Sequence, residues 1–208
     1  MTSIPQTGSL VLWLIAAISL LATYLFFQRL FHLHRAQIKT SDFLAGIFNI
    51  LGKGNVVEAI SQCDDTPGPV ARMARAAILA HQRNPVHVRQ AMEDVGLAEI
   101  PRLERHLSLL LSLAQIAPLA GLFGTVIGMM DVVKAIELQA PVLYAGDLSP
   151  GLQQALLTTA AGIFVAIPAY VGYNFLVSRA EAILLEMERA YAEISLYLDG
   201  HVPGEGTR

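Results

Sequence analysis

Two long apolar segments, residues 107–133 and 151–178, constrain this chain more than any other feature. A helix needs roughly 20 apolar residues to cross about 30 Å of membrane hydrocarbon, and both segments are longer than that. A third apolar segment lies near the N-terminus, at residues 10–28. The chain is 54% hydrophobic and only 15% charged, which is outside the range of ordinary soluble domains. We therefore expect an all-α membrane protein with three transmembrane helices.

Basic residues lie on one side of these predicted spans, and residues 1–9 contain neither Lys nor Arg. The positive-inside rule places basic flanks in the cytoplasm. We therefore expect residues 1–9 and the loop 134–150 outside the cytoplasm, and residues 29–106 and 179–208 inside it. The basic residues behind this topology are Arg29, Arg35, Lys39, Arg102, Arg105 and Arg179.

The segment between the first two spans, residues 29–106, has helical spacing of its apolar positions and no strand signal. Ser41 and Asp42 could cap a first helix, and Gly and Pro clusters separate it from those that follow. We expect a small helical cytoplasmic domain. Its helices should begin near Ser41, at Val56, at Val70 and at Asn84.

The ends of the spans that face this domain are expected to continue as helices. Beyond residue 178, Ile183, Met187 and Ile194 keep helical spacing. Before Leu107, Leu103 keeps the phase of the second span. We therefore expect long cytoplasmic helical extensions that rest against the small domain.

Polar residues lie deep inside the second and third spans. Lipid cannot satisfy their hydrogen bonds, so such groups usually face a protein neighbour or water. The alternative for each threonine is a hydrogen bond to a carbonyl one turn earlier in its own helix. These polar residues are Thr125, Gln154, Thr158 and Thr159.

Glycines and prolines accompany the polar residues. Glycines at helical spacing let two helix backbones approach closely. A proline in mid-span removes a backbone donor and bends the helix, which either serves packing or gives a flexible pore-lining helix. The glycines are Gly121, Gly124, Gly128 and Gly162, and the prolines are Pro118 and Pro168.

Several functional classes lack support in the sequence. The net charge of −3 and the absence of a dense basic stretch argue against nucleic acid as a partner. No phosphate-binding loop, zinc helix or nucleophile elbow is present, so we expect neither an enzyme nor a cofactor. His32 and His34 are two residues apart and point to different helix faces, so we expect no metal site. The single Cys63 indicates no redox role.

The chain resembles the MotA/TolQ/ExbB proton-channel family, and most closely its ExbB and TolQ branch, in two segments: AQIAPLAGLFGTVIGMM and SPGLQQALLTTAAGIFVAIPAYVGYN. The resemblance covers roughly residues 104–197 and includes two long motifs in the family's order. The topology expected above, with three spans and the N-terminus outside, is also that of the branch.

This resemblance implies a homopentamer in a bacterial inner membrane, with the N-terminus in the periplasm and the C-terminus in the cytoplasm. The pentamer would surround the single spans of an ExbD-like or TolR-like dimer. It would use the proton motive force to energise a TonB-like or TolA-like protein that spans the periplasm. By motif position, Thr125 and Thr159 would line the pore with Thr158 and Gln154, and the two threonines would face the partner's intramembrane aspartate.

One residue departs from the pattern of the branch, which usually has glutamate where this chain has Gln154. An amide cannot take up or release a proton, so the titrating group would come from the partner. Hydroxyls without a fixed acid could also suit sodium, so the ion stays open between H⁺ and Na⁺. Asp131 is expected to form a local ion pair with Lys134. A non-conducting membrane scaffold and a motility-motor stator of the same family are the other interpretations.

Overall fold

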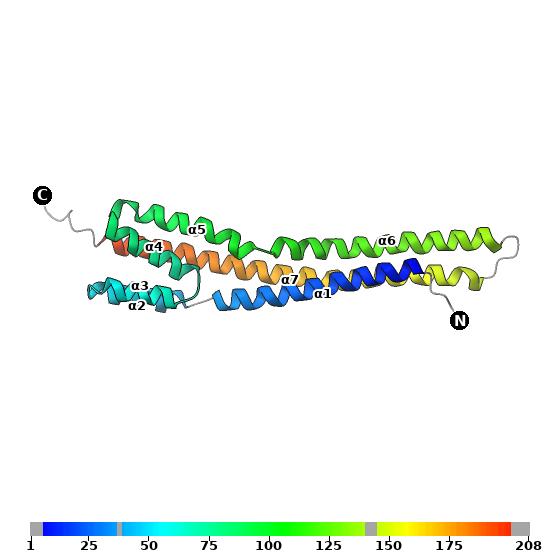
Figure 1. Ribbon diagram of the computed structural model, residues 1–208, viewed down its shortest axis with the longest axis horizontal. Helices are drawn as coiled ribbons and strands as arrows, with labels where there is room; N and C mark the ends of the chain where they lie inside the picture. The colour runs from blue at the N-terminus through cyan, green and yellow to red at the C-terminus, as the bar shows by residue number, and fades with distance from the viewer. Residues whose placement is uncertain (1–5, 37–38, 140–144, 201–208) are drawn as a thin grey trace. The chain divides into compact units, whose positions relative to one another are not determined.

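The computed structural model describes residues 6–36, 39–139 and 145–200, and every regular element in these ranges is a helix (Figure 1). The predicted all-α fold class is therefore confirmed. In chain order the elements are α1 (Gln6–Ala36), α2 (Thr40–Gly52), α3 (Val56–Asp65), α4 (Pro69–Arg83), the 3₁₀ helix η1 (Pro85–His87), α5 (Val88–Glu104), α6 (Leu107–Gln139) and α7 (Ala145–Asp199).

Three helices, α1, α6 and α7, contain stretches long and apolar enough to cross a membrane. The chain is thus a multi-pass membrane protein, as its three apolar segments predict. Both α6 and α7 run past the predicted ends of the outer loop at 134 and 150, and only residues 140–144 of that loop lie outside the described residues. Residues 1–5 and 201–208 also lie outside them.

The chain divides into two compact units, and the first contains the spans. It comprises the chain up to Arg29 together with His106–Leu176. Its core forms where α1 packs against α6 and α7. The buried residues of this core are Val11, Ile15 and Ile18 of α1, Ala117 and Ala120 of α6, and Ala166 of α7. Helices α1 and α7 also lie close together further along α1, since a Cβ at Gly172 of α7 would lie 2.8 Å from the Phe26 ring of α1.

The second unit, Leu30–Arg105 with the chain from Val177, is the predicted small helical domain. Helix α4 buries an alanine-rich face against α3 and α5. The last part of α7 belongs to this unit, and its predicted stripe of Ile183, Met187 and Ile194 is buried. Phe48 and Tyr197 stack with ring centroids 4.3 Å apart, and the Tyr197 hydroxyl donates to the Phe48 carbonyl at 3.1 Å. This part of α7 therefore rests against the small domain, as the sequence predicts.

Helix starts in this unit follow the predicted turn chemistry closely, with one difference. Helix α2 begins at Thr40, and its N-cap is Lys39, which makes no side-chain cap. Ser41 and Asp42 therefore lie in the first turn and do not cap the helix. The fourth helix is predicted to begin at Asn84, and the structure has Asn84 as the N-cap of η1. Its side-chain oxygen accepts a hydrogen bond from the Val86 amide at 3.1 Å.

The predicted continuation of the second span before Leu107 is wrong. Helix α5 ends at Glu104, and α6 begins at Leu107. Between them His106 has a φ of 66°, a left-handed conformation that ends a right-handed helix. Its carbonyl then accepts the first bond of α6, from the Leu110 amide at 3.1 Å.

Candidate functional site

Helices α6 and α7 approach each other so closely that only glycine fits at their contact points. A Cβ at Gly128 would lie 2.6 Å from the Gly151 carbonyl oxygen, and one at Gly162 would lie 2.6 Å from the carbonyl oxygen of Ala117. A Cβ at Gly121 would lie 2.9 Å from the Thr158 carbonyl oxygen. The helices run antiparallel, because rising numbers on α6 meet falling numbers on α7. This backbone contact sets the positions of all the polar side chains nearby.

Thr125 of α6 and Thr159 of α7 meet across this contact, and their hydroxyls form a hydrogen bond. Both hydroxyls also lie 3.3 Å from the Gly121 carbonyl oxygen, which belongs to the helix of Thr125. Both threonines are only partly buried. The structure thus brings together the two hydroxyls that the resemblance assigns to the pore.

Thr158 and Gln154 lie elsewhere, on the buried part of the α7 surface. The Thr158 side chain is fully buried against Gly124, where a Cβ would lie 2.5 Å from its Oγ1. Its hydroxyl donates back to α7, with the Gln154 and Ala155 carbonyl oxygens at 3.1 and 3.0 Å. Gln154 is 9% exposed. The intrahelical alternative therefore describes Thr158, while Thr125 and Thr159 also bond between helices.

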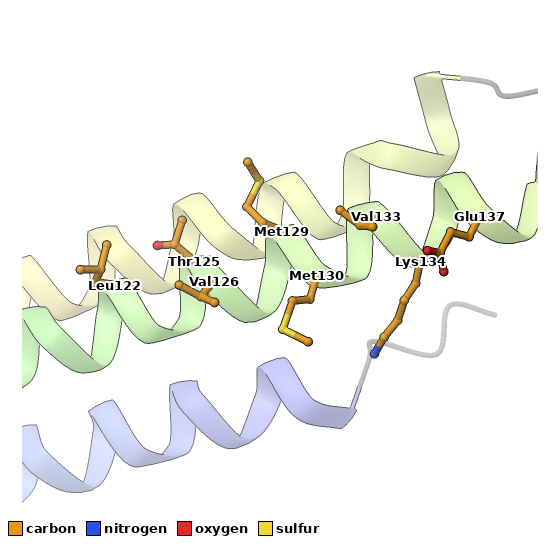
Figure 2. A pocket seen from close by; sticks show the side chains of 8 residues that line it. All are labelled: Leu122, Thr125, Val126, Met129, Met130, Val133, Lys134 and Glu137. Carbon is orange, nitrogen blue, oxygen red and sulfur yellow. The ribbon is translucent and has the colours of Figure 1, made fainter.

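A groove of about 550 Å³ runs along the exposed face of α6 and contains Thr125 (Figure 2). The rest of its lining is largely apolar, with Lys134 and Glu137 at one end. Figure 2 shows these side chains along successive turns of α6: Leu122, Thr125, Val126, Met129, Met130, Val133, Lys134 and Glu137. A hydroxyl on so apolar a face favours a protein neighbour over lipid.

The predicted ion pair between Asp131 and Lys134 is confirmed, with 3.8 Å between Asp131 Oδ1 and Lys134 Nζ. The other carboxylate oxygen, Oδ2, is buried without a hydrogen-bond partner among the described residues. The sequence does not predict that one oxygen of Asp131 is buried. Its one indication is the spacing of four residues between Ile127 and Asp131, because Ile127 packs against the core formed with α1.

The two mid-span prolines lie inside unbroken helices, Pro118 in α6 and Pro168 in α7. Pro118 is partly buried and Pro168 is exposed. Within the described ranges, no group of three or more His, Cys, Asp or Glu side chains is placed to hold a metal ion. The polar groups of the site are the threonine hydroxyls, the Gln154 amide, the carboxylates of Asp131 and Glu137, and the Lys134 ammonium group.

Comparison with known proteins places this geometry in a family. A family profile described as the MotA/TolQ/ExbB proton channel family matches residues 65–189. An ExbB homologue among the biopolymer transport proteins of Methanothermobacter thermautotrophicus is 26% identical over 95% of this chain and 72% of its own length. The biopolymer transport protein exbB1 of Vibrio cholerae is 31% identical over 64% of this chain and 58% of its own.

The Tol-Pal system protein TolQ of Haemophilus influenzae is 38% identical over 46% of this chain and 43% of its own length. The family profile covers more than half of the chain and includes α6, the Thr125–Thr159 pair and most of α7. The chain belongs to the MotA/TolQ/ExbB proton channel family.

Proposed function

We propose that this chain is the channel-forming subunit of an ion-driven stator in a bacterial inner membrane. In this proposal it couples the proton motive force to a TonB-like or TolA-like protein. The observation that carries the proposal is the hydrogen-bonded pair of hydroxyls, Thr125 and Thr159, at the edge of a glycine-lined helix contact. A hydroxyl both donates and accepts, so the pair can hold a water molecule or a carboxylate and release it when the carboxylate is protonated.

The groove on α6 supports an assembly of several copies. Its apolar lining includes Thr125, whose hydroxyl is poorly matched to lipid. A neighbouring subunit or a partner helix would cover this face. Family membership suggests an arrangement of five copies, each with its N-terminus in the periplasm. These copies would surround the single spans of an ExbD-like or TolR-like dimer.

The partner's aspartate is then the titrating group in the pore. Gln154 cannot exchange a proton, and it lies buried beside the α6–α7 contact. Thr125 and Thr159 would stabilise the ionised aspartate, whose cost in an apolar pore is otherwise prohibitive. Protons are the proposed ion because this arrangement needs only one titrating carboxylate from the partner.

Isolation of the assembly tests the partner half of the proposal. The tagged protein is purified from native membranes in mild detergent, and mass spectrometry identifies the retained proteins and the intact mass. We expect several copies of this chain with a short single-span protein that carries an aspartate in its span. Recovery of this chain alone, or with soluble proteins only, would favour a non-conducting scaffold.

A matched pair of substitutions tests the ion-pathway half. Thr159→Val removes a hydroxyl that reaches across the helix contact, whereas Thr158→Val removes one that bonds only within α7. Both substitutions preserve side-chain shape. We expect Thr159→Val to lower ion-driven activity by about tenfold or more with assembly intact, and Thr158→Val to retain most activity. Equal activities of the two variants would contradict the proposal.

A further inference from the structure

Two polar side chains of α6 and α7 bury atoms that lack hydrogen-bond partners in the described part of the chain. They are Oδ2 of Asp131 and both amide atoms of Gln154. The Gln154 side chain is more than nine-tenths buried. A buried polar group without a hydrogen bond is costly, and most costly where lipid excludes bulk water. Something in the native membrane therefore satisfies these atoms.

The register of α6 against α7 places the two side chains close together. Gly128 lies against the Gly151 carbonyl, and a Cβ on Gly151 would lie 2.8 Å from Val132. A Cβ on Gly128 would likewise lie 2.8 Å from the Ala155 Cβ, so the contact pairs Gly128 with Ala155 and Gly151 with Val132. Asp131 directly precedes Val132, and Gln154 directly precedes Ala155. Because the helices are antiparallel, this register places the two residues within about one turn of each other, or roughly 5 Å along the axis. One small molecule can span that separation between the ends of the side chains.

Both side chains also lie on the side of the contact that faces α1. Asp131 is one turn beyond Ile127 on α6, and Gln154 is two turns before Ala161 on α7. Ile127 and Ala161 pack against the core formed with α1. Residues separated by four or seven positions share a helix face. The pair is therefore separate from Thr125 and Thr159, which lie on the opposite side of the contact.

We propose that Asp131 and Gln154 share one bound water molecule and form a proton-binding site inside the subunit. The amide of Gln154 donates to the water oxygen, and the water donates to Asp131 Oδ2. Proton uptake converts the carboxylate and a hydronium ion into a carboxylic acid and water. The acid then donates its own hydrogen to the shared water. Only the physiological use of this site rests on the proposed function.

A water molecule fits the donor set better than a metal cation does. Hard cations such as Ca²⁺ or Mg²⁺ take six or more oxygen ligands, whereas here one carboxylate oxygen and one amide oxygen are available. The Thr158 hydroxyl already donates within α7. The charged groups nearest in the register are Lys134, paired with Asp131 Oδ1, and Asp147 at the start of α7. Helix α1 has no charged residue before Arg29.

Infrared difference spectroscopy of the purified complex tests the pairing. Acidification should produce a protonated-carboxyl band that Asp131→Asn abolishes. Gln154→Leu should shift that band to higher frequency, because the acid loses its hydrogen-bonded network. Gln153→Leu is the matched control, because Gln153 is the exposed amide next to Gln154 on α7, and this variant should leave the band at its wild-type frequency. A spectrum unchanged by Asp131→Asn, or a band indifferent to Gln154→Leu, overturns the proposal.

A high-resolution structure of the wild-type complex provides a test that needs no variant. It should show water density within hydrogen-bond distance of both Asp131 Oδ2 and the Gln154 amide. A direct hydrogen bond from Asp131 Oδ2 or from the Gln154 amide to another protein group, or a cation in a shell of several oxygens, overturns the proposal. The Thr159→Val assay separates the two proposals. If Thr159→Val retains full activity, the stator proposal is wrong, but the carboxyl band can still be present. If the band is absent, only the water-site proposal is wrong.

Discussion

The Thr125 and Thr159 hydroxyls both lie 3.3 Å from one carbonyl oxygen, that of Gly121, and they also bond to each other across two helices. Each hydroxyl has one hydrogen, so one of them donates to the carbonyl and the other donates to its neighbour. The pair is therefore a single hydrogen-bonded unit supplied by two segments of sequence. Its position depends on the close approach of α6 and α7 at Gly121 and Gly162. The first prediction concerns this unit.

We expect Thr125→Val and Thr159→Val each to lower ion-driven activity by about tenfold or more, since each removes the hydrogen bond between the two hydroxyls. The double variant should be little worse than the worse single variant, because either change breaks the shared bond. A double-mutant cycle on activity measures this coupling. Ser112→Ala is the control, since the exposed Ser112 hydroxyl bonds only within α6. Additive losses would show that the two hydroxyls act separately.

Gly124→Ala should destabilise the spanning unit by about 1–3 kcal/mol, the usual cost of overpacking. The added Cβ would lie 2.5 Å from both Cβ and Oγ1 of Thr158. Gly146→Ala is the control in the same unit, because a Cβ there meets nothing within 4 Å. Thermal unfolding of the purified complex should show a lower midpoint temperature for Gly124→Ala but not for Gly146→Ala. Adding Thr158→Gly to Gly124→Ala should recover part of the lost midpoint temperature. Equal midpoints for the two alanine variants would mean that the helices separate easily.

Glu99→Gln should loosen the packing of α4 against α5 by about 2–3 kcal/mol, since hydrogen bonds to charged groups are strong. The buried Glu99 carboxylate accepts two bonds from Arg72, at 2.8 and 2.6 Å, and one from Arg102 at 2.7 Å. Hydrogen exchange of the α4 and α5 amides in the complex measures this opening.

The control for Glu99→Gln is Asp64→Asn, which removes an exposed ion pair with Arg75 at 2.7 Å. Exposed pairs contribute at most about 1 kcal/mol. We expect amide protection to change little in this variant. Similar loss of protection in both variants would show that the Glu99 network contributes no more than a surface pair.

Cys63 should react slowly with thiol reagents in the folded protein. Burial above all, and then the charge of Asp64, raise the pKa of its thiol from 9.0 to about 11, while Arg75 opposes the shift. The thiolate is the reactive form, so labelling at pH 8 should be about 100-fold slower than for an ordinary thiol. The rate should keep rising with pH up to about 11. A plateau near pH 9 would contradict this prediction.

The same shift in pKa has a consequence for stability. The folded state holds the Cys63 proton more tightly than the unfolded state, so its contribution is complete below pH 9 and is lost as pH rises toward 11. Asp64→Asn should lower the pKa of Cys63 and speed labelling, whereas Arg75→Gln should raise the pKa and slow it. Labelling rates of the two variants at one pH in the window between 9 and 11 distinguish the two effects.

Much of the fold could be predicted from sequence because its signals are local. Apolar length alone indicates the three spans, and helical spacing indicates the stripe of Ile183, Met187 and Ile194. The break at His106 could not be predicted in this way. Leu103 and Leu110 keep one phase on both sides of it, and spacing reports which face is apolar but not the backbone conformation of a single residue.

The candidate site could be predicted less completely, because its geometry depends on how two helices are aligned. Motif position identified Thr125 and Thr159, but only the register of α6 against α7 shows that their hydroxyls meet. The burial of Gln154 and of one oxygen of Asp131 depends on how the helices of the spanning unit pack together. No pattern within a single span contains this information.

The Gly121 carbonyl gives the hydroxyl pair an unusual freedom. As part of α6, this oxygen is also placed to accept the Thr125 amide hydrogen within the helix. Under the proposed function, a partner carboxylate that accepts from both hydroxyls would therefore leave the carbonyl with its backbone bond. When the carboxylate leaves, one hydroxyl can again donate to this carbonyl and the other to its neighbour. Neither arrangement leaves the α6 backbone at this position without a hydrogen bond.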